Sequence, residues 1–66
     1  MAVMKVIEIM SDSDKSWEDA TRKGIAKASK SIKDIKSAWV QSQSVTVKDG
    51  EVKSFRVNLK LSFEVQ

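Results

Sequence analysis

Residues 55–65 alternate apolar and polar side chains without a break. Successive side chains of an extended strand point to opposite faces, whereas a helix would scatter this pattern around its axis. The pattern therefore predicts a strand with one apolar face and one polar face. The apolar face comprises Phe55, Val57, Leu59, Leu61, Phe63 and Val65. The polar face comprises Arg56, Asn58, Lys60, Ser62 and Glu64.

The length of this strand constrains the fold as much as its pattern does. The alternation extends back to Asp49-Gly50, a pair that favours a tight hairpin turn. The strand is then roughly 50 Å long at ~3.3 Å per residue. The one helix that the pattern predicts has about 17 residues and a length of ~26 Å, and a compact chain of this size has a radius of gyration of ~11 Å. We therefore expect other copies of the chain to cover part of the apolar face.

Composition narrows the functional classes. The 66 residues predict one domain spanning 1–66, with a core too small to be stable without further support. The chain has no cysteine and no histidine, which excludes disulfides, the usual zinc sites, thiol nucleophiles and imidazole bases. Glu8, Glu51 and Glu64 are scattered through the sequence rather than grouped. We therefore expect a protein that is not an enzyme.

Charge and hydropathy bear on partners and location. The net charge is +3, and many lysines follow residue 22 on the predicted helix and its exit. They fit a solvated helix face with acidic residues in its first turn, and they lack the interleaved aromatics of a nucleic-acid site. The apolar N-terminal run contains Lys5 and Glu8, unlike a signal peptide or a membrane span. We expect a soluble cytoplasmic protein without nucleic-acid or membrane partners.

Hydrophobic periodicity, strand-breaking residues and a helix cap predict the remaining helix and strands. Residues 3–10 predict a strand, which residues 11–14 break. Ser16 is a suitable N-cap for a helix over 16–32, with Asp19 at its third position. Gly24 lies on or beside the apolar stripe of that helix, where it permits close approach to the sheet. A second strand over 36–47 leads into the hairpin.

The order strand, helix, strand, strand predicts the topology. A helix reverses the chain, so the first two strands run in the same direction and the third runs against both. An antiparallel sheet then requires the third strand in the middle. The expected fold class is α+β, a single βαββ domain in which a three-stranded antiparallel sheet packs on one helix.

The second strand suggests a binding site on the face away from the helix. Ala38 and Val40 fall in one set of alternating positions, and Ser37, Trp39, Gln41 and Gln43 fall in the other. If the small apolar set faces the helix, Trp39 points away from its own core, towards the face that carries Arg56 and Asn58. An exposed indole beside amide and guanidinium groups suits a planar ligand. Equally, Trp39 suits an anchor at a subunit interface.

These features together resemble the dodecin family from end to end. The stretches that carry the resemblance are Lys5-Val6-Ile7-Glu8-Ile9, Ser16-Trp17-Glu18-Asp19-Ala20, Asp34-Ile35, the Asp49-Gly50 hairpin and residues 57–65. The resemblance implies twelve copies that form a hollow cage built from trimers. It also implies that the cage binds flavin (riboflavin or FMN) between trimers without covalent attachment, for storage or quenching rather than catalysis.

The residues that the resemblance assigns to flavin are altered in this chain. Ser37 stands where flavin-binding dodecins place the Trp that stacks on the ring, and Trp39 is displaced from it by ~6.6 Å along the strand. Arg56 replaces a ring-binding Gln and can donate hydrogen bonds but not accept them. Ser44 and Glu64 replace two arginines. The candidate cofactor-binding residues are therefore Trp39, Gln41, Arg56, Asn58 and Ser37.

The loss of the stacking Trp makes the chain similar to a dodecin-like branch that is described as flavin-free, with cation binding proposed. In this alternative the assembly has a structural role or binds calcium. Asp12, Asp14 and Glu18 supply the oxygen ligands that calcium prefers. Helix capping and loop solvation explain the same residues without an ion, and we assign no metal ligand from the sequence.

Overall fold

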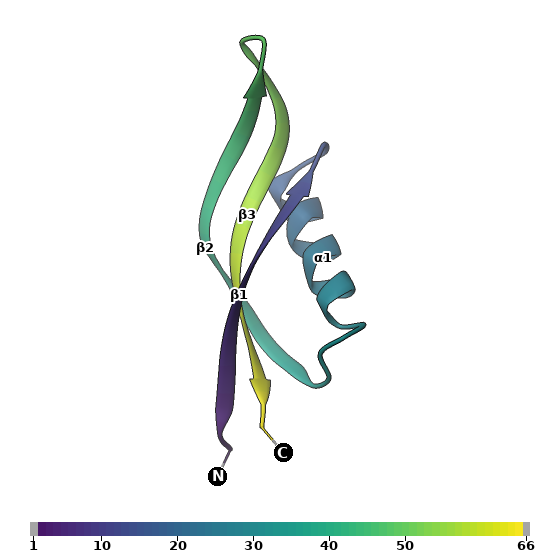
Figure 1. Ribbon diagram of the computed structural model, residues 1–66, viewed down its shortest axis with the longest axis vertical. Coiled ribbons are helices and arrows are strands. Elements are labelled where there is room, and N and C mark those ends of the chain that lie inside the picture. The colour runs from purple at the N-terminus through teal and green to yellow at the C-terminus, as the bar shows by residue number, and fades with distance from the viewer. Residues whose placement is uncertain (1, 66) are drawn as a thin grey trace.

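A computed structural model describes residues 2–65 as a three-stranded sheet with one helix against one face (Figure 1). The elements are β1 (Met4–Ser13), α1 (Trp17–Ala28), β2 (Ile35–Lys48) and β3 (Glu51–Glu64). β3 lies in the centre and pairs antiparallel with both neighbours. The predicted α+β class, βαββ order and central last strand are confirmed. No helix within residues 2–65 is long and apolar enough to cross a membrane.

The core lies between β3 and α1 and is small. Its fully buried members are Val57, Leu59 and Leu61 from β3 and Ala20 from the helix. The alternation predicted these three β3 residues, whereas Val65 at the end of the same series is exposed. Partly buried apolar residues from β1, α1 and β2 surround the four: Ile7, Ile9, Trp17, Ile25, Ala28, Ile35 and Ala38.

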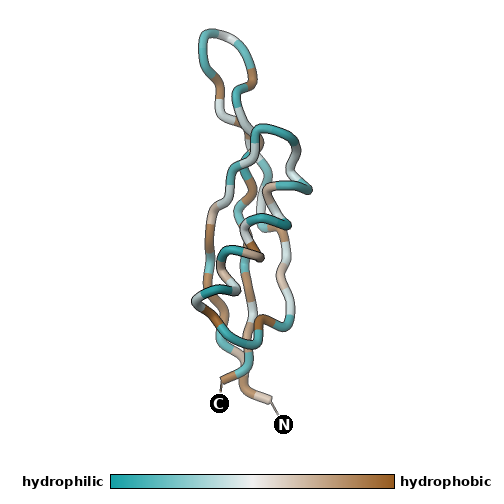
Figure 2. The backbone as a smooth tube through the Cα atoms, turned by 90° about the vertical axis from the view of Figure 1, so that its right-hand side faces the viewer, coloured by the Kyte–Doolittle hydropathy of each residue, from teal (hydrophilic) through white to brown (hydrophobic). Residues whose placement is uncertain are grey.

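The hairpin of β2 and β3 extends well beyond the helix (Figure 1). Its turn is Asp49-Gly50, with φ of 53° and 78°, the positive angles that a tight two-residue hairpin requires. Figure 2 shows hydrophilic residues around this turn and apolar positions recurring along the strands below it. The molecule measures 50 × 19 × 14 Å, and its radius of gyration of 13.5 Å exceeds the ~11 Å of a compact chain of this size.

β1 is longer than its sequence predicts. Residues 11–14 were expected to break the strand, but β1 continues to Ser13. Each of its last three side chains has a partner in the fold: the Ser11 hydroxyl donates to the Ala20 carbonyl at 2.7 Å, Asp12 accepts from Arg56, and the Ser13 hydroxyl donates to Asp19 at 2.6 Å. These non-local bonds keep a polar segment in the sheet.

The helix is shorter than predicted and ends at Ala28 instead of residue 32. The predicted N-cap is confirmed, because the Asp19 amide donates to the Ser16 hydroxyl at 2.9 Å. At the other end the Ser29 hydroxyl donates to the Ile25 carbonyl, and the Lys30 and Ser31 amides donate to carbonyls only three residues back. The chain then turns through Asp34, whose φ is 62°, into β2.

Trp17 joins the start of the helix to the hairpin. Its ring meets that of Phe55 edge to face, with centroids 5.2 Å apart and an interplanar angle of 77°. Its indole N–H donates to the Ser44 carbonyl of β2 at 2.9 Å. These two contacts position the part of the hairpin that leaves the helix.

Gly24 provides the close approach that its position in the sequence suggested. A Cβ added to Gly24 would lie 2.8 Å from the Ser11 Cβ and 3.0 Å from its Oγ. Real Cβ atoms do not approach so closely, so the helix packs against β1 at this point only because residue 24 has no side chain.

We expect Gly24→Ala to lower the free energy of unfolding by about 1 kcal/mol, because overpacking of about 1–3 kcal/mol outweighs the gain of ~1 kcal/mol in helix propensity. In a Ser11→Gly background the clash is absent, so the same change should stabilise the protein. Urea denaturation of the four proteins measures both effects. A destabilisation of equal size in both backgrounds would contradict the contact.

Candidate functional site

The face of the sheet turned away from α1, here called the outer face, carries the residues that the sequence singled out. Val57, Leu59 and Leu61 point to the helix, so the intervening β3 residues and their cross-strand partners point outward. From β3 the outer face takes Arg56, Asn58, Lys60, Ser62 and Glu64. From β1 it takes Met4, Val6, Glu8, Met10 and Asp12, and from β2 Ser37, Trp39, Ser42 and Ser44.

Apolar side chains flank this face on both edge strands. Val6 and Met10 of β1 are 50% and 61% exposed, and Trp39 of β2 is 46% exposed. The central strand between them is polar. Trp39 therefore points away from its own core, as the sequence predicted.

A bulge changes the side-chain alternation along β2. Val40 pairs with Leu59 and Ser42 with Asn58, so Gln41 is the extra residue and has no cross-strand partner. Beyond the bulge the faces are exchanged, and Gln43 lies opposite Val57 of the helix-facing set. The expectation that Gln43 shares a face with Trp39 is wrong, because an uninterrupted alternation was assumed.

The residue opposite Trp39 is Lys60, which the sequence reasoning did not select. Arg56 and Asn58 are on the same face but further along the sheet, opposite Ser44 and Ser42. The polar alternation of residues 55–65 already placed Lys60 outward, and only the cross-strand register was missing.

Arg56 is committed to a partner within the subunit. Its Nε lies 2.7 Å from Asp12 Oδ1 and its Nη2 lies 3.0 Å from Oδ2, a two-bond contact across the outer face. The hydrogen bond from Arg56 lowers the pKa of Asp12, and the carboxylate raises the pKa of Arg56. Three of the five N–H groups of the guanidinium, two on Nη1 and one on Nη2, remain for other ligands.

Asn58 and Ser37 have different surroundings. Asn58 Oδ1 is buried between the flanking strands and accepts no hydrogen bond from any residue in the range 2–65. A buried amide oxygen without a donor is costly, and a ligand or partner reaches this atom only if the Asn58 side chain rotates outward. Ser37, in contrast, bonds to the Ser62 hydroxyl across the sheet.

The carboxylates considered for calcium do not gather in one subunit. Asp12 is paired with Arg56, and Glu18 lies 3.0 Å from Arg22 on the helix surface. Within the described residues no three His, Cys, Asp or Glu side chains are placed to hold a metal ion together. A calcium site formed by Asp12, Asp14 and Glu18 of one chain is therefore not present in this arrangement.

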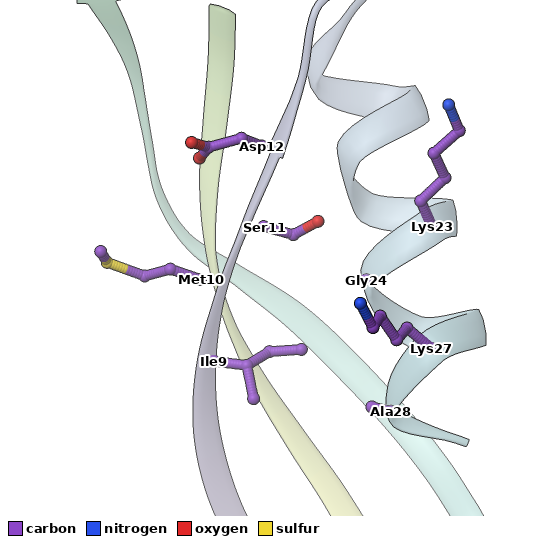
Figure 3. A pocket seen from close by; sticks show the side chains of 8 residues that line it. All are labelled: Ile9, Met10, Ser11, Asp12, Lys23, Gly24, Lys27 and Ala28. Atoms are coloured by element: carbon purple, nitrogen blue, oxygen red, sulfur yellow. The ribbon is translucent and has the colours of Figure 1, made fainter. Parts of the chain in front are cut away.

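A hollow of about 470 Å³ lies between the free edge of β1 and the helix. Figure 3 shows Ser11 pointing towards the helix at Gly24, and Met10 and Asp12 pointing to the opposite side. Lys23 and Lys27 flank this hollow on the helix. None of the residues that the sequence suggested for cofactor binding lines it: Trp39, Gln41, Arg56, Asn58 and Ser37.

Comparison with known proteins gives a consistent result. The model of the Dodecin family matches residues 3–66. The curated calcium dodecin of Mycobacterium tuberculosis is 35% identical over 66 residues, covering 100% of this chain and 93% of that protein.

Solved structures agree in fold. A dodecin from Streptomyces coelicolor superposes with a TM-score of 0.93 at 25% identity, covering 98% of this chain and 93% of that one. A crystal structure of the Mycobacterium tuberculosis calcium dodecin, described as having a novel calcium-binding site, gives a TM-score of 0.85 at 35% identity and covers 97% and 91% of the two chains.

The Asp12–Arg56 pair predicts an acid-sensitive contribution to stability. Since the folded-state pKa of Asp12 is lowered, its contribution is complete above the ordinary pKa of about 4 and is lost as the pH falls through the lowered value. The melting temperature of the parent protein should fall as the pH drops below about 4. In Asp12→Asn, which has no carboxylate to protonate at this position, that fall should be smaller. Asp14→Asn is the control, because Asp14 forms no ion pair with any described residue. If the melting temperature of Asp12→Asn falls below about pH 4 as steeply as that of the parent protein, the pair does not have this role.

Proposed function

The chain belongs to the dodecin family, and from this premise we propose that its copies assemble into a closed homo-oligomer that holds a small ligand between subunits. The outer face carries the argument. Val6, Met10 and Trp39 leave large apolar areas exposed on the face that the helix does not cover. Exposed apolar areas of this kind are typical of surfaces that meet another protein chain.

Shape and core size support the same proposal. The chain exposes 4888 Å² of surface, against about 4200 Å² for a compact monomer of this size. Only four apolar residues are fully buried in the described part of the chain, and chains this small commonly need oligomerisation for stability. We propose twelve copies built from trimers, as the family implies, with each copy a single domain of residues 1–66.

Flavin is the first candidate ligand, and the described residues fit it in part. The exposed Trp39 indole offers a stacking surface, and the Asn58 Oδ1, buried in the single chain, would accept a hydrogen bond from a ring N–H once its side chain rotates outward. Ser37 cannot stack, and Arg56 is held by Asp12. A flavin bound here would be held by Trp39, Gln41 and Asn58, in a non-catalytic role of storage or quenching.

Calcium is the second candidate, favoured by the similarity to a curated calcium dodecin. Since the carboxylates of one subunit do not converge, a calcium ion would need oxygen ligands from more than one copy. Glu8, Asp12 and Glu64 lie on the outer face, where copies meet in the proposed assembly. This candidate leaves Trp39 as an interface anchor.

Val6→Lys should reduce the assembly to smaller species, because it places a charge in the apolar area that the neighbouring copy covers. Size-exclusion chromatography with light scattering measures the mass, and far-UV circular dichroism checks the fold. Ala26→Lys, the same kind of change on the exposed side of the helix, is the matched control and should keep the full mass. A folded Val6→Lys protein of unchanged mass would contradict assembly through the outer face.

Titration with riboflavin and FMN, followed by flavin fluorescence, separates the two ligands. Quenching that Trp39→Ala abolishes and Trp39→Phe retains is expected for flavin held on the indole. Quenching that persists in Trp39→Ala would show that the flavin does not stack there. The second candidate predicts a different result. The oligomer would not quench flavin fluorescence, calcium would raise its melting temperature, and a chelator would reverse that rise.

A further inference from the structure

A second hollow, of about 400 Å³, opens on the outer side of the hairpin and lies apart from Trp39. Its charged lining comes from three cationic side chains, Lys48, Lys53 and Arg56, and one carboxylate, Asp12. Asp12 and Arg56 neutralise each other through their two hydrogen bonds. Neither lysine takes part in an ion pair within residues 2–65. Glu51 lies opposite Lys48 on the hairpin but lines the neighbouring hollow and not this one, so the side chains that line this hollow carry a net charge of +2.

Besides the lysines, two hydroxyl groups at the hollow provide a hydrogen-bond donor. Thr46 and Ser54 lie opposite each other on β2 and β3, and their hydroxyls share one hydrogen bond. Because each hydroxyl has a single hydrogen, whichever oxygen accepts that bond keeps its own hydrogen free to donate elsewhere. Arg56 also keeps its Nη1 group, since its Nε and Nη2 bond to Asp12. Apart from the occupied Asp12, the polar groups at this hollow are donors or cations.

A bulge in β3 contributes Lys53 to the hollow. Thr46 pairs with Ser54 and Val47 with Val52, so Lys53 is the extra residue of β3 at this point. In a regular strand Lys53 would share the helix-facing set with Phe55 and Val57. A bulge re-aims its side chain, and Lys53 instead lines the same hollow as the outward Ser54 and Arg56.

We propose that this hollow binds an oxyanion of the phosphate class, either free inorganic phosphate or the phosphate group of a phosphorylated ligand. A doubly charged anion matches the net charge of +2 on the side chains that line the hollow, and its acceptor oxygens match the donors around it. The inference rests on the proposed function in one respect. The hollow opens on the face that the assembly covers, where burying two unpaired ammonium groups is costly without an anion.

Inorganic phosphate is the probe for the first test, titrated into the full-length protein by calorimetry at ionic strength held constant with KCl. We expect saturable binding. Lys48→Gln and Lys53→Gln should each weaken it by about tenfold, the effect of losing one charge-assisted hydrogen bond. Lys48→Arg, which keeps the charge, should retain it. The pair Lys30→Gln/Lys33→Gln removes the same charge as Lys48→Gln/Lys53→Gln from an exposed part of the chain and should leave binding unchanged.

Competition distinguishes the two sources of the anion. FMN that displaces phosphate, when riboflavin does not, identifies the phosphate group of a larger ligand. If phosphate binds and FMN does not compete with it, the ligand of the hollow is free inorganic phosphate. Weak binding that KCl abolishes, or an equal loss in both lysine pairs, would show diffuse attraction and overturn the site.

The oligomeric state of the same samples separates this inference from the proposed assembly. A full-sized oligomer without saturable phosphate binding would overturn the anion site and leave the assembly standing. A monomer that binds phosphate through Lys48 and Lys53 would overturn the assembly and leave the site.

Discussion

The structure depends on the burial of one face of β3 against a single helix. Val57, Leu59 and Leu61 are fully buried there, and they are the centre of a core that contains one other fully buried apolar residue among those described. A helix of 12 residues covers only part of a strand of 14 residues, because the rise per residue in a strand is about twice that in a helix. The far part of the hairpin is left without cover as a direct consequence, and no element among residues 2–65 packs on the outer face.

Close contact between α1 and β1 keeps this small core tight. The helix reaches β1 because Gly24 has no side chain at the position of Ser11, whose hydroxyl then bonds to the Ala20 carbonyl. The same end of β1 presents Asp12 to the opposite face, where it holds Arg56. One short polar segment thus secures the helix on one side of the sheet and organises the outer face on the other.

The outer face has two chemically distinct regions. Near the middle of the sheet, apolar side chains on β1 and β2 flank a polar central strand that contains the unpartnered Asn58 oxygen. Towards the hairpin, two lysines and a pair of hydroxyls surround a hollow whose only carboxylate is occupied. An apolar area favours contact with another copy, and a cationic hollow favours an anion, so both regions are suited to an assembly that encloses ligands.

Local patterns in the sequence determined the elements, their order and the buried face of β3, because strand alternation, the Ser16 cap and the Asp49-Gly50 turn act over a few neighbouring residues. They also placed Trp39 and Asn58 on the outer face. Only the tertiary structure decided where β1 and α1 end, which side chain lies opposite Trp39, and how Arg56 is used. These features depend on cross-strand register, on three register shifts between β2 and β3, and on bonds between distant residues, such as Asp12 and Arg56. A bulge inserts one residue without a clear sequence signal and exchanges the faces beyond it, so the set of residues at a site on such a sheet is known only once the strands are paired.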